Sequence, residues 1–274
     1  MSRTSRISVG SIEVISLTDG GAEFGAELFP NATEDELNTL IAAAGAEKIE
    51  TNFNAFIVRN AGRTLLVDAG PRDMFGPTAG FLSDAMAEAG VAPEDVTDIF
   101  FTHLHPDHIA GAITAEGAAV FDKVEVKVSD IDHDFWKNGD FSDETLQQWA
   151  GLANMTLNAY GERVSTISGE AEIIPGVTMQ MMPGHTPGHA GFRVDDGGQG
   201  FIHLGDMVHA EKIQLANPEI SIAFDIDADT ARATRKAGLD MVATDGLACS
   251  GGHMLRPTLG RLERSGDGYR FVTG

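Results

Sequence analysis

The segment THLHPDH, residues 102–108, holds the densest group of potential metal ligands in the chain. It supplies His103, His105, Asp107 and His108 directly after an apolar run. Neutral imidazoles and a carboxylate are suitable ligands for a borderline cation such as zinc. Because Asp107 and His108 are adjacent, they cannot easily reach the cation that His103 and His105 would hold. The spacing therefore favours two metal ions over one.

Three later segments add ligands of the same kinds. PGHTPGH, residues 183–189, contains glycines and prolines that fix a sharp loop and give His185 a defined direction. HLGDMVH, residues 203–209, places Asp206 after a glycine, where a carboxylate can bridge two cations. His253 follows a glycine pair in CSGGHM. Each segment is a weak signal alone, and together they complete a set of ligands for two ions.

The pattern of the first half predicts elements that would carry these residues. The β-branched, apolar run at 96–102 predicts a buried strand that delivers the first motif to its C-terminal end. Residues 53–60 and 63–70 predict two strands joined at Gly62, a hairpin that ends in Asp68. Helices are expected at 31–44, with Thr33 as its cap, and at 77–90, with a glycine stop.

The second half repeats this alternation of strands and helices. We expect a helical stretch at 130–160, a helix at 228–238 that stops at Gly238, and a strand at 240–244. Further strands are expected at 123–129, at 167–182, at 190–196, at 200–206, at 259–264 and at 268–272. Alternating strands and helices without a short repeat predict one layered α/β domain over residues 1–274.

Composition limits the partners. The 19 Lys and Arg residues against 41 Asp and Glu give a formal charge of -22, which disfavours nucleic acid and anionic membranes as partners. Residues 1–17 contain no long apolar run, so neither a signal peptide nor a spanning helix is expected. The single cysteine, Cys249, excludes an internal disulfide and fits the cytoplasm best; a small buried residue is its expected role.

The combination of H-x-H-x-D-H, a distant histidine in PGHTPGH, the aspartate in GD and a late histidine resembles the metallo-β-lactamase superfamily. This resemblance implies an αββα sandwich with two divalent metal ions, zinc first and manganese, iron or cobalt as alternatives. By the same resemblance, His103, His105 and His185 hold one ion, Asp107, His108 and His253 hold the other, and Asp206 bridges them.

One ligand position required a choice, because Asp245 follows an expected strand and could also serve the second ion. The family's spacing, placed on HMLRPTLGRL, favours His253, with Pro257 four residues later. Arg256 departs from the family, in which an apolar aromatic residue is more usual at this position. The resemblance therefore does not predict the shape of this side of the pocket.

Within the superfamily, the segments FGPTAGFL, GDMVHAEKIQLANPEISIAFDID and GDGYRFV look most similar to the methyl parathion hydrolase and lactonase-like group. By this resemblance Asp68 orients a ligand histidine, with a hairpin-capping turn residue as the alternative. His189 is expected to support the metal loop. The resemblance assigns the substrate pocket to Phe75, Trp136, His209 and Phe224.

The resemblance implies a hydrolase in which a metal-bridging hydroxide opens lactones or cleaves esters, with phosphotriesters such as methyl parathion as a side activity. Asp107 would transfer the proton and Asp206 would hold both ions. A thioester hydrolase resembling glyoxalase II is an alternative, but its basic patch would have only Arg256, Arg261 and Arg264. A non-catalytic metal-binding protein is a further alternative. The expected partners are a small molecule and a second copy of the chain in a homodimer.

Overall fold

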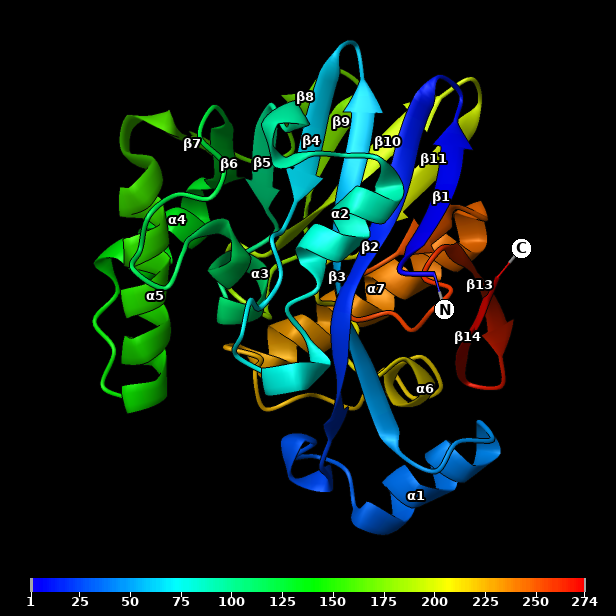
Figure 1. The fold of residues 1–274 in the computed structure, drawn as a ribbon. Coiled ribbons are helices and arrows are strands. Elements are labelled where there is room, and N and C mark those ends of the chain that lie inside the picture. Colours follow the sequence, from blue (N-terminus) through cyan, green and yellow to red (C-terminus); the bar gives the residue numbers. More distant parts are fainter. Residues whose placement is uncertain (1, 274) are drawn as a thin grey trace.

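Two mixed sheets lie face to face in the computed structural model, which describes residues 2–273 (Figure 1). The first is 7-stranded in the order β1-β2-β3-β4-β5-β6-β7, and the second is 7-stranded in the order β14-β13-β12-β11-β10-β9-β8. The first contains β1 (Thr4–Val9), β2 (Ile12–Phe24), β3 (Ile49–Asn60), β4 (Arg63–Val67), β5 (Asp98–Phe101), β6 (Glu125–Ser129) and β7 (Val164–Ile167). The second contains β8 (Glu172–Ile174), β9 (Val177–Met181), β10 (Ala190–Asp196), β11 (Gln199–His203), β12 (Ala248–Ser250), β13 (Gly260–Ser265) and β14 (Gly268–Val272).

Helices cover the outer face of each sheet. Because successive residues of a strand point to opposite faces, each strand packs one set of side chains between the sheets and the other set against the helices. In β5, Phe100 packs between the sheets, whereas Ile99 and Phe101 pack with the helices outside the first sheet. In β11, Phe201 faces the first sheet and Ile202 faces the helix outside the second. The helices are α1 (Glu34–Ala43), α2 (Leu82–Ala89), α3 (Pro106–Ile109), α4 (Asp130–Asn138), α5 (Glu144–Tyr160), α6 (Glu211–Gln214) and α7 (Ala228–Asp245). With α2, α4 and α5 outside one sheet and α7 outside the other, the layers are αββα, as the family resemblance implies.

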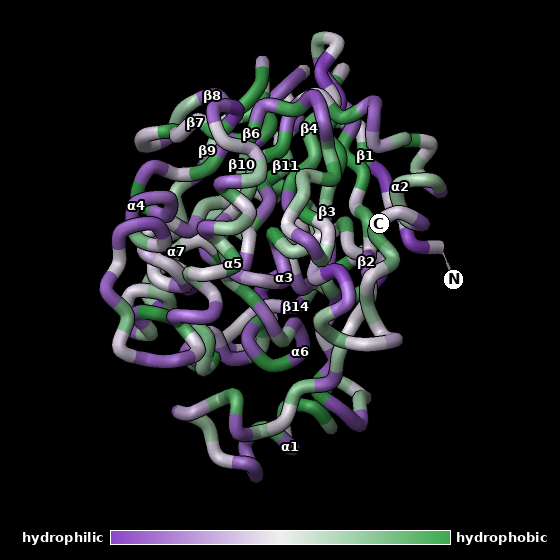
Figure 2. The backbone as a smooth tube through the Cα atoms, turned by 60° about the vertical axis from the view of Figure 1, so that its left-hand side comes forward, coloured by the Kyte–Doolittle hydropathy of each residue, from purple (hydrophilic) through white to green (hydrophobic). Residues whose placement is uncertain are grey.

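Hydrophobic residues are concentrated along the strands between the layers (Figure 2). Phe56, Phe100, Phe192 and Phe201 are all 0% exposed there. Burying a side chain of this size stabilises the fold by about 1.5–3 kcal/mol. No helix within residues 2–273 combines the length and the apolar character needed to cross a membrane.

The long strands β2 and β3 run beyond the sheet and lead to α1, at the bottom of Figure 1. Leu37 and Ile41 of α1 join a separate apolar cluster that also includes Ile213 of α6. The helix begins as predicted, because the Thr33 hydroxyl accepts a hydrogen bond from the Glu36 N–H at 3.2 Å. This extension carries Phe24, at the end of β2, to the neighbourhood of Phe224.

Most predicted elements are confirmed, including the hairpin of β3 and β4 and the buried strand β5. The helix predicted at 77–90 begins only at Leu82, and the stretch 130–160 divides into α4 and α5 near Gly139. The strand predicted at 240–244 is wrong, because α7 continues through it to Asp245. Leu239 and Val242 lie one helical turn apart and pack together against the second sheet. Gly246, in the left-handed conformation, ends the helix in place of Gly238.

Candidate metal centre

The predicted ligands come from loops that follow neighbouring strands. His103 and His105 follow β5, and Asp206 follows β11. His253 follows β12, which is parallel to β11, while β5 is parallel to β4. Parallel strands bring their carboxyl ends to one edge of a sheet, and residues from both sheets meet there. His185 reaches the same place from the loop between β9 and β10.

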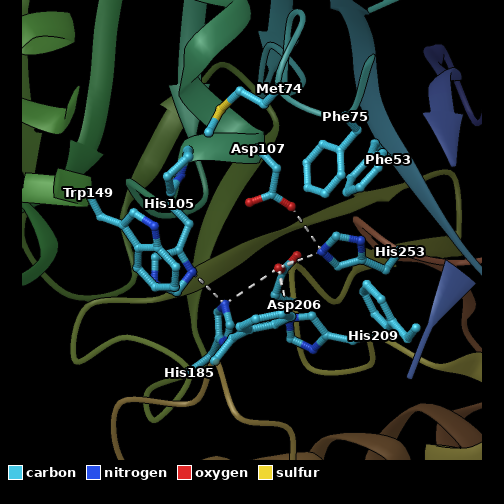
Figure 3. Close-up of a pocket in the computed structure, with 13 residues that line it drawn as sticks. Phe53, Met74, Phe75, His105, Asp107, Trp149, His185, Asp206, His209 and His253 are labelled. Atoms are coloured by element: carbon cyan, nitrogen blue, oxygen red, sulfur yellow. Dashed lines mark hydrogen bonds and ion pairs between the residues drawn. The ribbon is translucent and has the colours of Figure 1, made fainter. Parts of the chain in front are cut away.

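The Asp206 carboxylate lies at the centre of the histidines (Figure 3). Its Oδ2 atom is 2.9 Å from His253 Nε2, 3.1 Å from His108 Nε2 and 3.5 Å from His185 Nε2. Three groups of residues offer ligand atoms that lie within 4.8 Å of one another: His103 with His105 and His185; Asp107 with His108, Asp206 and His253; and His185 with Asp206 and His209. The first two groups are the two ion sites that the resemblance implies, and Asp206 lies where it can serve both.

The unpaired polar atoms of this cluster fit metal cations. Within residues 2–273, His103 Nε2 and Asp206 Oδ1 are buried and have no hydrogen-bond partner, and His105 Nδ1 and His185 Nε2 face each other at 2.9 Å. An unsatisfied buried polar atom costs about 1–3 kcal/mol, and coordination of a cation would remove that cost. Burial, assisted by neighbouring imidazoles, holds the pKa values of His103, His105 and His185 well below the ordinary value. These rings are therefore neutral at pH 7 and have lone pairs for a metal.

In the second group of ligands the histidine pKa values are shifted in the opposite direction. Burial lowers the pKa values of His108 and His253, but nearby carboxylates, above all Asp206, more than offset it and raise both. Burial raises the pKa of Asp206, but His108 and His253 outweigh it and hold the value well below the usual range. Without a cation, protons on the histidines thus balance the carboxylate charge. A divalent cation would replace these protons.

Four of the five ligand histidines are held by a further hydrogen bond through their other ring nitrogen; the exception is His105, whose Nε2 has no partner within residues 2–273. His108 Nδ1 donates to Asp68 Oδ2 at 2.8 Å, and the Thr102 N–H donates to Asp68 Oδ1 at 2.9 Å. His253 Nδ1 donates to the Asn52 carbonyl at 2.8 Å. These bonds fix the rings with Nε2 toward Asp206, the usual arrangement around bound metals.

An apolar pocket opens directly above these ligands (Figure 3). Its volume is about 130 Å³. Phe75 packs on Phe53 with ring centroids 4.4 Å apart, and the Trp149 ring lies 4.8 Å from the His105 ring. The apolar lining consists of Phe24, Phe53, Met74, Phe75, Trp149 and Phe224. Of the described residues that line the pocket, none is lysine or arginine; the two carboxylates, Asp107 and Asp206, belong to the ligand cluster, and the rest of the walls is mainly aromatic and apolar.

Comparison with known proteins agrees with this geometry. A family model described as the metallo-beta-lactamase superfamily matches residues 51–253. The chain belongs to this superfamily. Two solved structures superpose with a TM-score of 0.92 over 100% of this chain and 98% of the other. One, at 27% identity, is AidC, a dizinc quorum-quenching lactonase in complex with a product, and the other, at 26%, is AbOPH, a hydrolase in the beta lactamase superfamily.

Curated relatives are similar over a shorter stretch. An N-acyl homoserine lactonase from Bacillus sp is 29% identical over 110 residues, which are 40% of this chain and 37% of that protein. An N-acyl homoserine lactonase from Bacillus cereus is 26% identical over 119 residues, 43% of this chain and 41% of that one. The matched stretch thus spans less than half the length of these two lactonases.

In this metallo-β-lactamase fold, the pocket prediction needs one correction. Phe75, His209 and Phe224 line the pocket, but Trp136 does not. Trp136 is 1% exposed and lies behind His105, at 5.4 Å between ring centroids, so it packs in the core and supports that ligand. Trp149, which the sequence pattern did not single out, forms the wall instead.

The supporting residues also fall into predicted and missed groups. His189 lies where it was expected, since its Nδ1 donates to the Met182 carbonyl and its Nε2 accepts from the Asp206 N–H at 2.8 Å. Asp225 was missed; its Oδ1 accepts from His185 Nδ1 at 3.0 Å. No local pattern marks Asp225, because its partner lies 40 residues away in the chain.

The remaining candidates lie outside the metal cluster. Asp245 ends α7 and borders a separate surface hollow with Asp195 and Asp196. Cys249 is buried in β12, and burial raises the pKa of its thiol to about 12. The Arg256 guanidinium donates to the Ser2 carbonyl at 3.1 Å, outside the apolar pocket.

Proposed function

We propose that this protein is a metal-dependent hydrolase that opens lactones and cleaves neutral esters at a dinuclear centre, with zinc as the metal. The observation that carries the proposal is the placement of two groups of buried ligands, several atoms of which lack any other partner, beneath an apolar pocket. The similarity to a dizinc lactonase over nearly the whole chain supports the same substrate class.

In this proposal the residues divide into two ion sites and a bridge. His103, His105 and His185 would hold the first ion, and Asp107, His108 and His253 would hold the second. Asp206 would serve both ions. When bound, the ions supply a Lewis acid for the substrate oxygen and lower the pKa of water, so that no side chain has to act as the nucleophile.

The protein's own contribution includes proton transfer and substrate orientation. The Asp107 side chain is 20% exposed and faces the pocket, whereas Asp206 is 2% exposed. Asp107 can therefore accept a proton released at the centre and return it to the leaving oxygen of the opened lactone. His209 lies on the pocket wall between His185 and His253, with its Nε2 3.2 Å from Asp206 Oδ2. We assign its ring as a contact of the bound substrate.

The pocket walls select the substrate by charge and polarity. An acyl chain or an aromatic ring gains free energy by contact with Phe75, Trp149 and Phe224, whereas an anionic group placed against these walls, away from the metal ligands, would be desolvated with no lysine or arginine to pair with. Neutral phosphotriesters satisfy the same requirement, and we assign them as a side activity. The glyoxalase II-like alternative is disfavoured, because Arg261 donates to the Gly246 carbonyl and Arg264 pairs with Asp240, away from the pocket.

Metal analysis combined with hydrolysis assays tests this proposal. The purified protein would be analysed for metal, then assayed with an acyl-homoserine lactone, a p-nitrophenyl ester and methyl parathion, before and after chelation. We expect about two ions per chain, the highest kcat/KM with the lactone or ester, and loss of turnover on chelation. Fewer than one ion after reconstitution, with no turnover, would overturn the hydrolase and favour a non-catalytic metal-binding protein.

A further inference from the structure

A buried carboxylate on α4 links the two loops that carry the first group of ligands. Asp132 Oδ2 accepts a hydrogen bond from the Leu104 N–H at 2.8 Å, and Leu104 lies between His103 and His105. The other oxygen, Oδ1, accepts from the hydroxyl of Thr186, the residue after His185. One side chain thus joins the loop after β5 to the loop before β10.

The side chain and backbone of Asp132 are packed tightly against the loops that carry the ligands. The residue is 0% exposed, and a buried carboxylate is costly unless several donors satisfy it. Gly188 lies against it so closely that a Cβ at that position would collide with the Asp132 backbone. Trp136, one turn further along α4, packs on the His105 ring. The inner face of α4 therefore contacts the first ligand group at two points.

The second ligand group depends on other supports. His108 is held by Asp68, at the end of β4, and His253 is held by the carbonyl of Asn52 in β3. The amide of Asn54, also in β3, donates to the Met254 carbonyl at 2.8 Å and fixes the loop that carries His253. These bonds come from the first sheet and not from α4.

We propose that Asp132 is a positioning residue for the first metal ion. By holding Leu104 and Thr186 together, it sets the separation of the His105 and His185 imidazoles. Removing the Asp132 side chain lets the two loops move apart and lowers the affinity for the first ion, while the second ion keeps its ligands. This inference rests on the dinuclear centre proposed above.

The test compares metal binding by Asp132 variants with that of the wild type. Metal-free protein would be titrated with Co²⁺, followed by visible absorption, and with Zn²⁺ in competition with a chelator. In Asp132→Ala we expect one ion to bind as in the wild type and the other about 10- to 100-fold more weakly, the range typical of a lost support. Asp132→Asn should restore much of the affinity, because its amide oxygen can accept from Leu104 while the Thr186 hydroxyl accepts from its N–H.

Matched variants separate positioning from general instability. Asp134→Asn changes an exposed carboxylate on the same helix and should bind both ions normally. Thr186→Val replaces only the hydroxyl with a methyl group and should lower the affinity for the same ion. This variant keeps the test available even if Asp132→Ala fails to fold. Equal weakening of both ions, or no weakening, in folded variants would overturn the inference. A wild type that binds fewer than two ions would instead overturn the proposed dinuclear centre, on which this inference rests.

Discussion

The wall formed by Trp149 should determine how strongly the enzyme prefers long acyl chains. This half-buried residue of α5 lines the pocket, and its ring centroid lies 6.5 Å from that of Phe224. A substrate chain that lies against these rings, on the side that faces the pocket, removes its methylene groups from water. Each buried methylene is worth about 0.8 kcal/mol. If the indole covers about two of them, Trp149→Ala should cost about 1.6 kcal/mol, or about 15-fold in kcat/KM, for an octanoyl substrate.

The assay measures kcat/KM for acetyl, butanoyl, hexanoyl and octanoyl esters of p-nitrophenol, and the result is the ratio of octanoyl to acetyl. This ratio cancels any effect of the variant on metal binding, which matters because Trp149 also contacts His105. Trp149→Phe should retain most of the preference. Met155→Ala, an exposed position on the same helix, serves as the control and should leave the ratio unchanged.

Two results would refute the reasoning about Trp149. If Trp149→Ala lowers kcat/KM by the same factor for every chain length, the residue acts through His105 and not through the substrate chain. If the wild type shows no preference for octanoyl over acetyl, the chain does not lie in the apolar pocket at all.

Three further predictions follow from buried side chains. Asp68→Asn cannot accept both of the N–H groups that Asp68 now serves, so affinity for the second ion should fall about 10- to 100-fold; unchanged zinc content after dialysis against a chelator would contradict this. Trp136→Ala should cost about 3–5 kcal/mol in urea unfolding, because the side chain is 1% exposed, and a loss below about 1 kcal/mol would place it outside the core. Burial lowers the pKa of His203 from 6.5 to about 3, so the unfolded state binds the extra proton and stability falls as the pH drops through this interval. His203→Asn should therefore reduce the slope of unfolding free energy against pH in the metal-free protein by about 1.4 kcal/mol per pH unit between pH 4 and 6, and an unchanged slope would show that this ring is not the titrating group.

The sequence predicts those parts of the fold that depend on local signals. The Thr33 cap and the turn at Gly62 are determined by a few adjacent residues, and both are found in the structure. The segment 240–244 was assigned wrongly because β-branched and apolar residues in a short run suit a strand and a buried helix alike. Packing of Leu239 and Val242 against the second sheet decides for the helix, and that contact depends on residues far away in the chain.

The metal ligands are marked by local sequence signals, whereas the residues that support them and the pocket wall depend on contacts between distant parts of the chain. The ligands occur in short segments after strands, so the motifs can be found in the sequence, and the family resemblance implies which of them share an ion. The residues that hold the ligands in place do not occur in such segments. Asp132 bonds to Leu104, 28 residues away in the chain, and Asp225 bonds to His185, 40 residues away. Whether Trp136 or Trp149 faces the pocket depends on the break near Gly139 and on the direction of α5, which no periodicity reveals.

The aromatic wall is harder still to predict, because its members come from separate elements. Phe24 and Phe53 are in β2 and β3, Trp149 is in α5, and Phe75 and Phe224 are in loops. Phe75 and Phe224 were assigned to the pocket only through the family resemblance; by pattern alone, each of the five resembles a core residue, since an aromatic side chain that faces a pocket and one that faces the core obey the same periodicity. The candidate ligands can therefore be found from sequence motifs, whereas the full set of side chains that forms the pocket wall appears only where these elements meet.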